Sequence, residues 1–303
     1  MTSNIKNARF LRPASTSLII QRLQRGDSLN LSGGRGIGKT RLLEDIKSAN
    51  LENTCVIHVS LKGYQESYKA FCNAVFLSSD FKVRPPSSLN AVIKKLKETK
   101  KQTFLFIDDF QYISDNPNLD PKYNQQFIDY LNSIRNTSGI SLLAVSHEPL
   151  SKIIIFMGKK PVTSVLNLQN IHLDRLMHHE ITDEISRRFQ NLDENAKNVL
   201  ASHLNNHENN YELLEHYESK IISKGDTVLD SAVLDRWYKN FKKTNRSSLM
   251  RLVIKLTGVM KRWILVITPF LPGFNQLKKI THGPLVFISS YVKKILGASK
   301  DTE

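Results

Sequence analysis

The chain has 303 residues, of which 40% are hydrophobic and 23% are charged, and its formal net charge is +15. This length and composition exclude a wholly disordered chain and leave room for one large domain or two smaller ones. Two cysteines, Cys55 and Cys72, are too few for a disulfide framework. No run of 18 uncharged apolar residues predicts a transmembrane helix.

The first 175 residues alternate between short apolar runs and segments whose apolar residues recur at helical spacing. We expect strands at residues 28–32, 55–61, 103–107, 140–145 and 165–173, and helices at 39–49, 66–76, 88–99 and 123–135. This alternation predicts an α/β fold with a parallel sheet flanked by helices.

The composition changes twice further along the chain. From about residue 174 to 244 the pattern is polar and helical, with Asp193 and Asp230 as expected helix caps. After residue 244 it becomes basic and very apolar. We therefore expect a core at residues 1–173, a small helical lid at 174–244 and a basic amphipathic helical tail at 245–303.

A glycine-rich segment follows the first expected strand. Its residues, Gly33, Gly34, Arg35, Gly36, Ile37, Gly38, Lys39 and Thr40, fit the phosphate-binding pattern G-x-x-x-x-G-K-[ST] and open an amphipathic helix. The glycines let successive N–H groups point inward around phosphate oxygens. We expect Lys39 to bind the β- and γ-phosphates and Thr40 to ligate Mg²⁺. We include Arg41, the next residue, among the nucleotide-binding residues.

A second motif ends the third expected strand. Four apolar residues run into Asp108 and Asp109, which would lie at the carboxyl edge of the sheet, where ligands bind in open α/β folds. Asp108 would hold Mg²⁺ through water, and Asp109 would be the catalytic base or the group that orients the attacking water. In isolation such a segment is as readily a strand followed by a solvated acidic turn. Its place after the glycine-rich loop favours a nucleotide site.

These motifs, in this order, resemble the AAA+ and STAND branch of P-loop ATPases, particularly the archaeal-type ATPases. Phe10-Leu11-Arg12-Pro13 resembles the family's adenine-side segment, and the strand that ends at Ser146 resembles the one that carries its sensor residue. Residues 171–176 and the helical segment that follows resemble the step into a lid. The resemblance implies a five-stranded sheet of order 5-1-4-3-2, ATP and Mg²⁺ as ligands, ATPase activity, and catalytic roles for Lys39 and Ser146 beside Asp109.

Two departures from the family pattern matter. Most AAA+ proteins carry Asp-Glu where this chain has Asp108-Asp109, whose second side chain is one methylene shorter. STAND-type switches often carry Asp-Asp, so the resemblance implies a nucleotide-operated switch with slow or partner-stimulated turnover. Where relatives often place an arginine finger, this chain has Lys159 and Lys160, which lack the planar guanidinium. Other cationic candidates for that role are Arg175, Arg187 and Arg188.

The net charge is concentrated in the last part of the chain. Residues 241–303 hold 12 Lys or Arg against Asp301 and Glu303, so this fifth of the chain carries +10 of the total +15. Residues 247–268 and 285–296 form two basic amphipathic segments with prolines between them. Three interpretations stay open: contact with an anionic membrane, binding to nucleic-acid phosphates, or packing on the lid or a neighbouring subunit.

We therefore expect an ATP-operated switch or assembly regulator in a multiprotein system, of the anti-phage defence or mobile-element type. It would form a homo-oligomer, and its tail would contact a membrane or a protein partner. The alternative is a DNA-dependent ATPase, such as a loader, transposition regulator or motor, whose tail binds nucleic acid. Residues 1–16 contain no apolar run, so we expect no secretory signal and a cytoplasmic protein, with a peripheral position at the inner face of a membrane as a further option.

Overall fold

The computed structural model describes residues 10–79, 85–86, 88–99, 101–113, 119–134, 137–152, 154–157, 160–163, 166, 168–224 and 229–244. The chain divides into two compact units, residues 1–238 and 239–303. The expected tail at 245–303 lies outside the described residues. Among the residues that the structure describes, no helix is long and apolar enough to span a membrane.

A five-stranded parallel sheet forms the centre of the described structure. Its strands are β1 (Leu29–Ser32), β2 (Thr54–Ser60), β3 (Gln102–Asp108), β4 (Ile140–Ser146) and β7 (Gln169–His172). Their order is β2-β3-β4-β1-β7, with β1 paired to β4 on one side and to β7 on the other. This order confirms the predicted α/β fold and the order 5-1-4-3-2.

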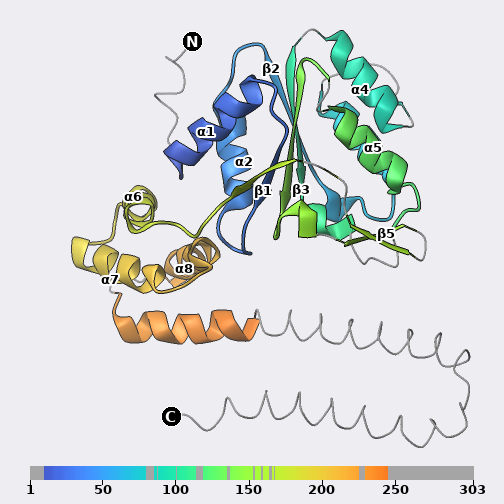
Figure 1. The fold of residues 1–303 in the computed structure, drawn as a ribbon. Helices are drawn as coiled ribbons and strands as arrows, with labels where there is room; N and C mark the ends of the chain where they lie inside the picture. The colour runs from blue at the N-terminus through green and yellow to red at the C-terminus, as the bar shows by residue number, and fades with distance from the viewer. Residues whose placement is uncertain are drawn as a thin grey trace, which may run out of the picture. The chain divides into compact units, whose positions relative to one another are not determined.

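Helices cover both faces of the sheet (Figure 1). One face is covered by α1 (Pro13–Gln24) and α2 (Lys39–Ser48), and the other by α3 (Tyr68–Leu77), α4 (Leu89–Glu98) and α5 (Gln125–Ile134). Alternate residues of β3 enter the two cores: Phe104 and Phe106 pack on the α1–α2 side, and Leu105 and Ile107 on the other. Because both faces of β3 are buried, residues 104–107 form a continuous apolar run.

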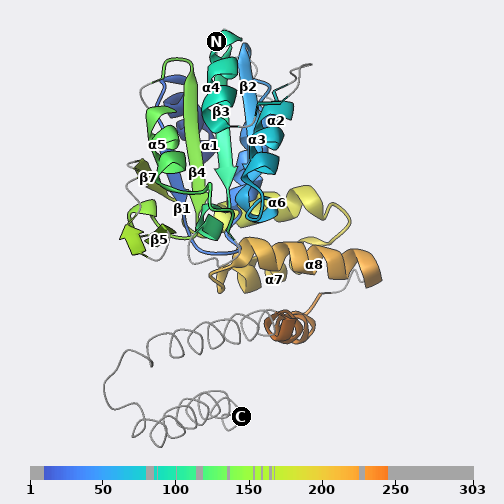
Figure 2. The same cartoon turned by 90° about the vertical axis from the view of Figure 1, so that its right-hand side faces the viewer.

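Three helices follow the sheet: α6 (His178–Arg188), α7 (Glu194–Asn205) and α8 (Asn210–Lys224). They lie beyond the carboxyl ends of the strands (Figures 1 and 2). A further helix occupies residues 231–244. Both expected caps are confirmed, because Asp193 accepts a hydrogen bond from Ala196 N and Asp230 accepts one from Val233 N.

The structure adds elements that the sequence patterns did not predict. Helix α1 starts at Pro13, which suits the first helical position because that residue needs no N–H donor. A two-stranded antiparallel sheet, β5 (Ile154–Met157) and β6 (Lys160–Thr163), precedes β7. The last strand of the parallel sheet, β7, is shorter than the predicted strand at residues 165–173.

Candidate nucleotide-binding site

The glycine-rich loop connects β1 to α2 and turns sharply at two glycines. Gly36 and Gly38 have φ angles of 76° and 91°, a region that side chains other than glycine rarely adopt. Gly38 is the N-cap of α2, so the loop delivers Lys39 and Thr40 to the first turn of that helix. Ile37 is buried beneath the loop, whereas the side chain of Arg35 is 62% exposed on its outer side. The loop therefore has the geometry of an anion cradle at a helix N-terminus.

Lys39 is turned onto the backbone of its own loop. Its Nζ donates hydrogen bonds to the carbonyl oxygens of Gly33, at 2.7 Å, and Gly34, at 2.6 Å. Burial lowers the pKa of Lys39 to about 8, although the charges of Asp108 and Asp109 act to raise it. The two carbonyls hold the ammonium in a buried position where a phosphate group would otherwise be its partner.

Thr40 and Asp108 meet across the gap between α2 and β3. The Thr40 hydroxyl donates to Asp108 Oδ2 at 3.0 Å, and Asp109 N donates to Asp108 Oδ1 at 2.8 Å. His58 Nε2 lies 3.7 Å from Asp108 Oδ2, a distance for an ion pair rather than a hydrogen bond. Burial raises the pKa of Asp108, but these neighbours outweigh burial and bring the pKa below its usual value. Asp108 is thus held as a carboxylate beside a hydroxyl.

Asp109 stands at the carboxyl end of β3 with both carboxylate oxygens occupied. Ser60, at the end of β2, donates to Oδ2 at 2.8 Å, and Gln111 Nε2 donates to Oδ1 at 3.1 Å. The φ angle of Asp109 is 57°, in the left-handed region, where Asp is one of the few tolerated residues. Ser60 could not be predicted from the sequence because its link to Asp109 depends on the pairing of β2 with β3, whereas Gln111 lies only two residues from Asp109.

Ser146 lies at the end of β4, fully buried. Its hydroxyl accepts a hydrogen bond from Asn30 Nδ2 at 2.9 Å and donates to Glu148 O at 2.5 Å. The next residue, His147, lies between this position and the acidic pair: its Nε2 is 3.5 Å from Gln111 Nε2. Burial, aided by the charge of Lys39, lowers the pKa of His147. The structure therefore brings both Ser146 and the unpredicted His147 to the sheet edge, with the Ser146 hydroxyl engaged by the protein.

Arg12 braces the loop against the segment after β7. The buried guanidinium donates through Nη2 to Ile37 O at 3.0 Å and to Asp174 O at 2.7 Å. Its Nη1 lies 4.0 Å from Glu180 on α6. Burial lowers the pKa of Arg12. The structure places this predicted adenine-side residue in contact with the underside of the loop and with the start of the helical segment.

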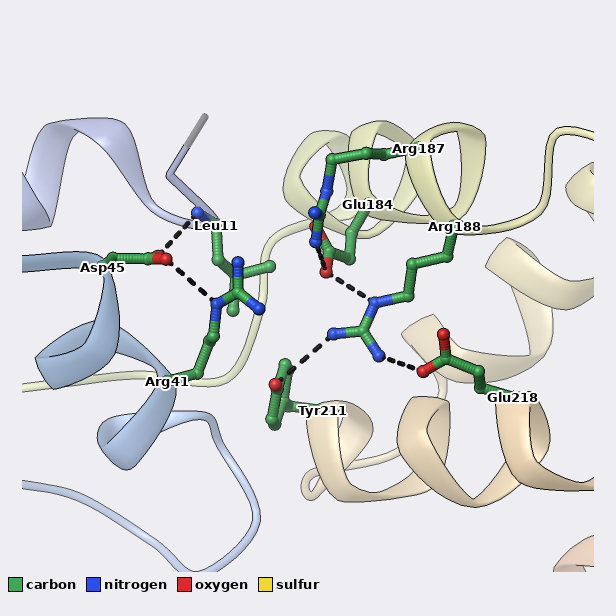
Figure 3. A network of polar contacts seen from close by, with 8 residues as sticks. All are labelled: Leu11, Arg41, Asp45, Glu184, Arg187, Arg188, Tyr211 and Glu218. Atoms are coloured by element: carbon green, nitrogen blue, oxygen red, sulfur yellow. Dashed lines mark hydrogen bonds and ion pairs between the residues drawn. The ribbon is translucent and has the colours of Figure 1, made fainter. Parts of the chain in front are cut away.

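Arg41 points away from the loop towards the helices of the expected lid (Figure 3). Its Nε donates to Asp45 Oδ1 at 3.0 Å, and the other oxygen of Asp45 accepts from Leu11 N at 2.8 Å. Although burial acts to lower its pKa, Asp45 dominates and the pKa of Arg41 is raised. Asp45 therefore ties α2 to the segment that precedes α1, and Arg41 holds the carboxylate of Asp45 in place.

The arginines considered as finger candidates make ion pairs within the helical segment. Arg187 and Arg188 both contact Glu184, and Arg188 also contacts Glu218 and the Tyr211 hydroxyl (Figure 3). Arg175 donates to Asn205 O at 3.1 Å. Lys159 lies outside the described residues, and Lys160 is the first residue of β6.

A parallel sheet with helices on both faces, a glycine-rich loop before a helix, and acidic residues at the end of a neighbouring strand define a P-loop nucleotide-binding protein. A family model described as an AAA domain matches residues 22–154, so this part of the chain is similar to the P-loop AAA+ proteins that the motifs resemble. No curated protein sequence matches the chain.

Solved structures share this fold at low sequence identity. Domain III of the Thermotoga maritima replication initiation protein DnaA is 17% identical, with a TM-score of 0.50 over 75% of this chain and 91% of that one. The Aeropyrum pernix ORC2 protein is 14% identical, with a TM-score of 0.52 over 75% of this chain and 66% of that one. A Walker-type ATPase of Pyrococcus abyssi is 15% identical, with a TM-score of 0.52 over 86% and 79%.

Proposed function

We propose that the chain binds ATP with Mg²⁺ at the loop of residues 33–40 and hydrolyses it slowly, as a nucleotide-operated switch. The observation that carries this proposal is the 3.0 Å contact between the Thr40 hydroxyl and Asp108 Oδ2. A hydroxyl and a carboxylate from separate elements meet here beside an anion cradle. No cluster of three or more His, Cys, Asp or Glu residues suits a metal elsewhere among the described residues.

The donor set fits magnesium. Mg²⁺ binds oxygen ligands and keeps several of its waters, so it needs few ligands from the protein. One hydroxyl and one carboxylate beside the phosphates are sufficient. Thr40 would bind the ion directly and Asp108 through water. When bound, the ion supplies positive charge to the β- and γ-phosphate oxygens.

The other residues of the proposed site would position the nucleotide and the attacking water and stabilise the charge of the phosphates. Lys39 would exchange the carbonyls of Gly33 and Gly34 for phosphate oxygens, which make stronger, charge-assisted hydrogen bonds.

Asp109 would accept the proton of the attacking water, and the donors Ser60 and Gln111 fix the orientation of its carboxylate. Ser146 would take the role of sensor through a change of its hydroxyl partners, and Arg12 and Arg41 would hold the loop and α2 in place.

Two substitutions test this assignment. Lys39→Ala should abolish ATP binding in calorimetry, because the charge that faces the phosphates is removed. Asp109→Asn should retain ATP binding but lose at least 100-fold in turnover, in line with the usual contribution of a general base of about 10²–10⁴. Unchanged binding by Lys39→Ala would refute the nucleotide site. Parent-like turnover by Asp109→Asn would show that another residue is the base.

As a switch, the chain would act within a multiprotein system of the defence or mobile-element type, as a homo-oligomer with a protein partner. Lys159, Lys160, Arg175, Arg187 and Arg188 remain the candidates for a cation offered to a neighbour's site. The basic segment at 245–303 would provide the contact with a partner or an anionic membrane, which implies a cytoplasmic or peripheral location.

A second candidate function is that of a DNA-dependent ATPase. Two proteins with this fold are a replication initiation protein, DnaA, and ORC2. The 12 Lys and Arg residues of positions 241–303 would bind DNA phosphates in this case, and loss of the tail would remove DNA stimulation.

A further inference from the structure

The first turn of α8 contacts the glycine-rich loop directly. Glu212 N donates a hydrogen bond to Gly36 O at 2.9 Å. The side chain of the same residue reaches the loop's cation: Glu212 Oε1 lies 3.4 Å from Arg35 Nη2. Glu212 therefore contacts two consecutive loop residues, one through its backbone and one through its carboxylate.

No side chain fits between the loop and this helix. A Cβ on Gly36 would lie 2.6 Å from Glu212 Oε2 and 3.0 Å from Asn209 Cβ. A Cβ on Gly38 would lie 3.2 Å from Cγ of Tyr211. The segment from Asn209 to Glu212 thus covers the loop at van der Waals distance, and the carboxylate of Glu212 is the group nearest to Gly36.

This contact places a negative charge beside the loop, against Arg35 on its outer side and next to Gly36. The N–H groups of the loop and the N-terminus of α2 favour an anion. In this conformation the loop's cations are satisfied by the protein: Arg35 by Glu212, and Lys39 by the carbonyls of Gly33 and Gly34. A nucleotide must replace the carbonyl partners of Lys39, and its phosphates would repel the carboxylate of Glu212 beside Gly36.

We propose that Glu212 is an anionic latch, which holds α8 on the loop and which nucleotide phosphates must displace. The inference rests on the proposed function and adds a means of regulating the same site. A ligand shifts the equilibrium between the latched and the unlatched loop only by its difference in affinity for these two states. Because nucleotide would bind the unlatched loop, the latch lowers the apparent affinity for nucleotide. The β- and γ-phosphates are the groups that the loop would hold beside Glu212, and ADP lacks one of them and AMP lacks both. The latch therefore opposes ATP more than ADP, and ADP more than AMP.

The test is calorimetry of Mg²⁺-loaded ATP and ADP, and of AMP, with the full chain and with Glu212→Gln. The amide keeps the size of the side chain and removes its charge. We expect ATP to bind about tenfold more tightly to the variant, the size expected for removing one nearby like charge. The gain should be smaller for ADP and smallest for AMP, and it should shrink at 1 M salt, where the screening length falls to about 3 Å.

Glu194→Gln is the matched control. Glu194 is also an acidic residue in the first turn of a lid helix, and its side chain is 81% exposed and paired with Lys197. Helix α7, about 18 Å long, separates it from the turn that leads into α8. This variant should bind all three nucleotides like the parent. Glu212→Ala provides a second test of the latch, and circular dichroism establishes that each variant is folded.

The outcomes separate the latch from the nucleotide site. Tighter ATP binding by both Glu212 variants, with no change in Glu194→Gln, supports the latch. Unchanged or weaker ATP binding by both Glu212 variants, while the parent binds ATP, overturns the latch and leaves the proposed function standing. If neither the parent nor the Glu212 variants bind any nucleotide, the proposed function itself is wrong.

Discussion

At the scale of single residues, the charge state of Lys39 couples the site to pH. Its ammonium is buried against two carbonyl oxygens, and burial lowers its pKa to about 8. Below that pH the residue is charged and ready for phosphate. Above it the empty protein holds neutral Lys39 and must take up a proton to bind nucleotide.

ATP affinity should therefore be constant below about pH 8 and fall above it. Bound phosphates raise the pKa of Lys39, so the affinity should drop about tenfold from pH 7 to pH 9. Calorimetry across this range measures the effect, together with proton uptake detected in buffers of different ionisation enthalpy. Lys39→Arg, which stays charged, is the control and should lack this dependence. A flat profile for the parent would show that Lys39 is not the titrating group.

The same residue affects the stability of the empty protein. A lysine with a lowered pKa is less readily protonated in the folded state, so the unfolded chain binds more protons between about pH 8 and 10.5. The contribution of Lys39 to the free energy of unfolding consequently increases as the pH rises through this window. Below pH 8 the empty fold bears the full cost of the buried charge, which bound phosphate would relieve.

At the scale of elements, Asn30 links two adjacent strands. It lies on β1, is 1% exposed, and donates to Ala144 O and to the Ser146 hydroxyl on β4. Its Oδ1 accepts a hydrogen bond from Leu150 N at 3.0 Å. One buried side chain thus joins the strand before the glycine-rich loop to the strand that carries Ser146.

Asn30→Ala should lower the free energy of unfolding by about 2–4 kcal/mol, since it leaves a small cavity and buried groups without partners. Urea denaturation followed by circular dichroism gives the value. The control Asn90→Ala changes an exposed residue of α4 and should shift stability by no more than about 0.5 kcal/mol. If both variants unfold at the same urea concentration, the Asn30 hydrogen bonds contribute little.

At the scale of the whole molecule, two-thirds of the net charge belongs to a fifth of the sequence. The 12 basic residues at 241–303 are interleaved with apolar ones, a pattern suited to an anionic membrane surface. We expect the full chain to float with anionic vesicles, and a chain ending at residue 244 to lose flotation while it still binds ATP. Neutral vesicles are the control, and both chains should leave them unbound.

The same pair of chains tests the alternative. ATPase rates are measured with double-stranded DNA at moderate salt, with vesicles, and with neither. Stimulation of the full chain by DNA, lost in the shortened chain, would support the DNA-dependent ATPase instead of the membrane contact. A tail that only packs within the protein would change neither rate nor flotation.

Local patterns were enough to predict the glycine-rich loop, the strand that ends in Asp108 and Asp109, and the caps Asp193 and Asp230. Each depends on residues close together in the sequence, whose conformation or burial follows from their own chemistry. Sequence patterns did not predict elements whose residues have conflicting propensities or whose length is only a few residues. Helix α1 carries several Ser and Thr residues, which favour caps and turns, and the four-residue strands β5 and β6 give little periodicity.

The sequence by itself therefore determined the class of fold and the residues that face phosphate and magnesium in the proposed site. Only the tertiary structure decided what those residues contact. Ser60 reaches Asp109 through strand pairing, Asn30 reaches Ser146 across 116 positions, and Glu212 reaches Arg35 across 177. Such contacts depend on how strands and helices pack, and packing joins residues whose separation in the chain carries no periodic signal.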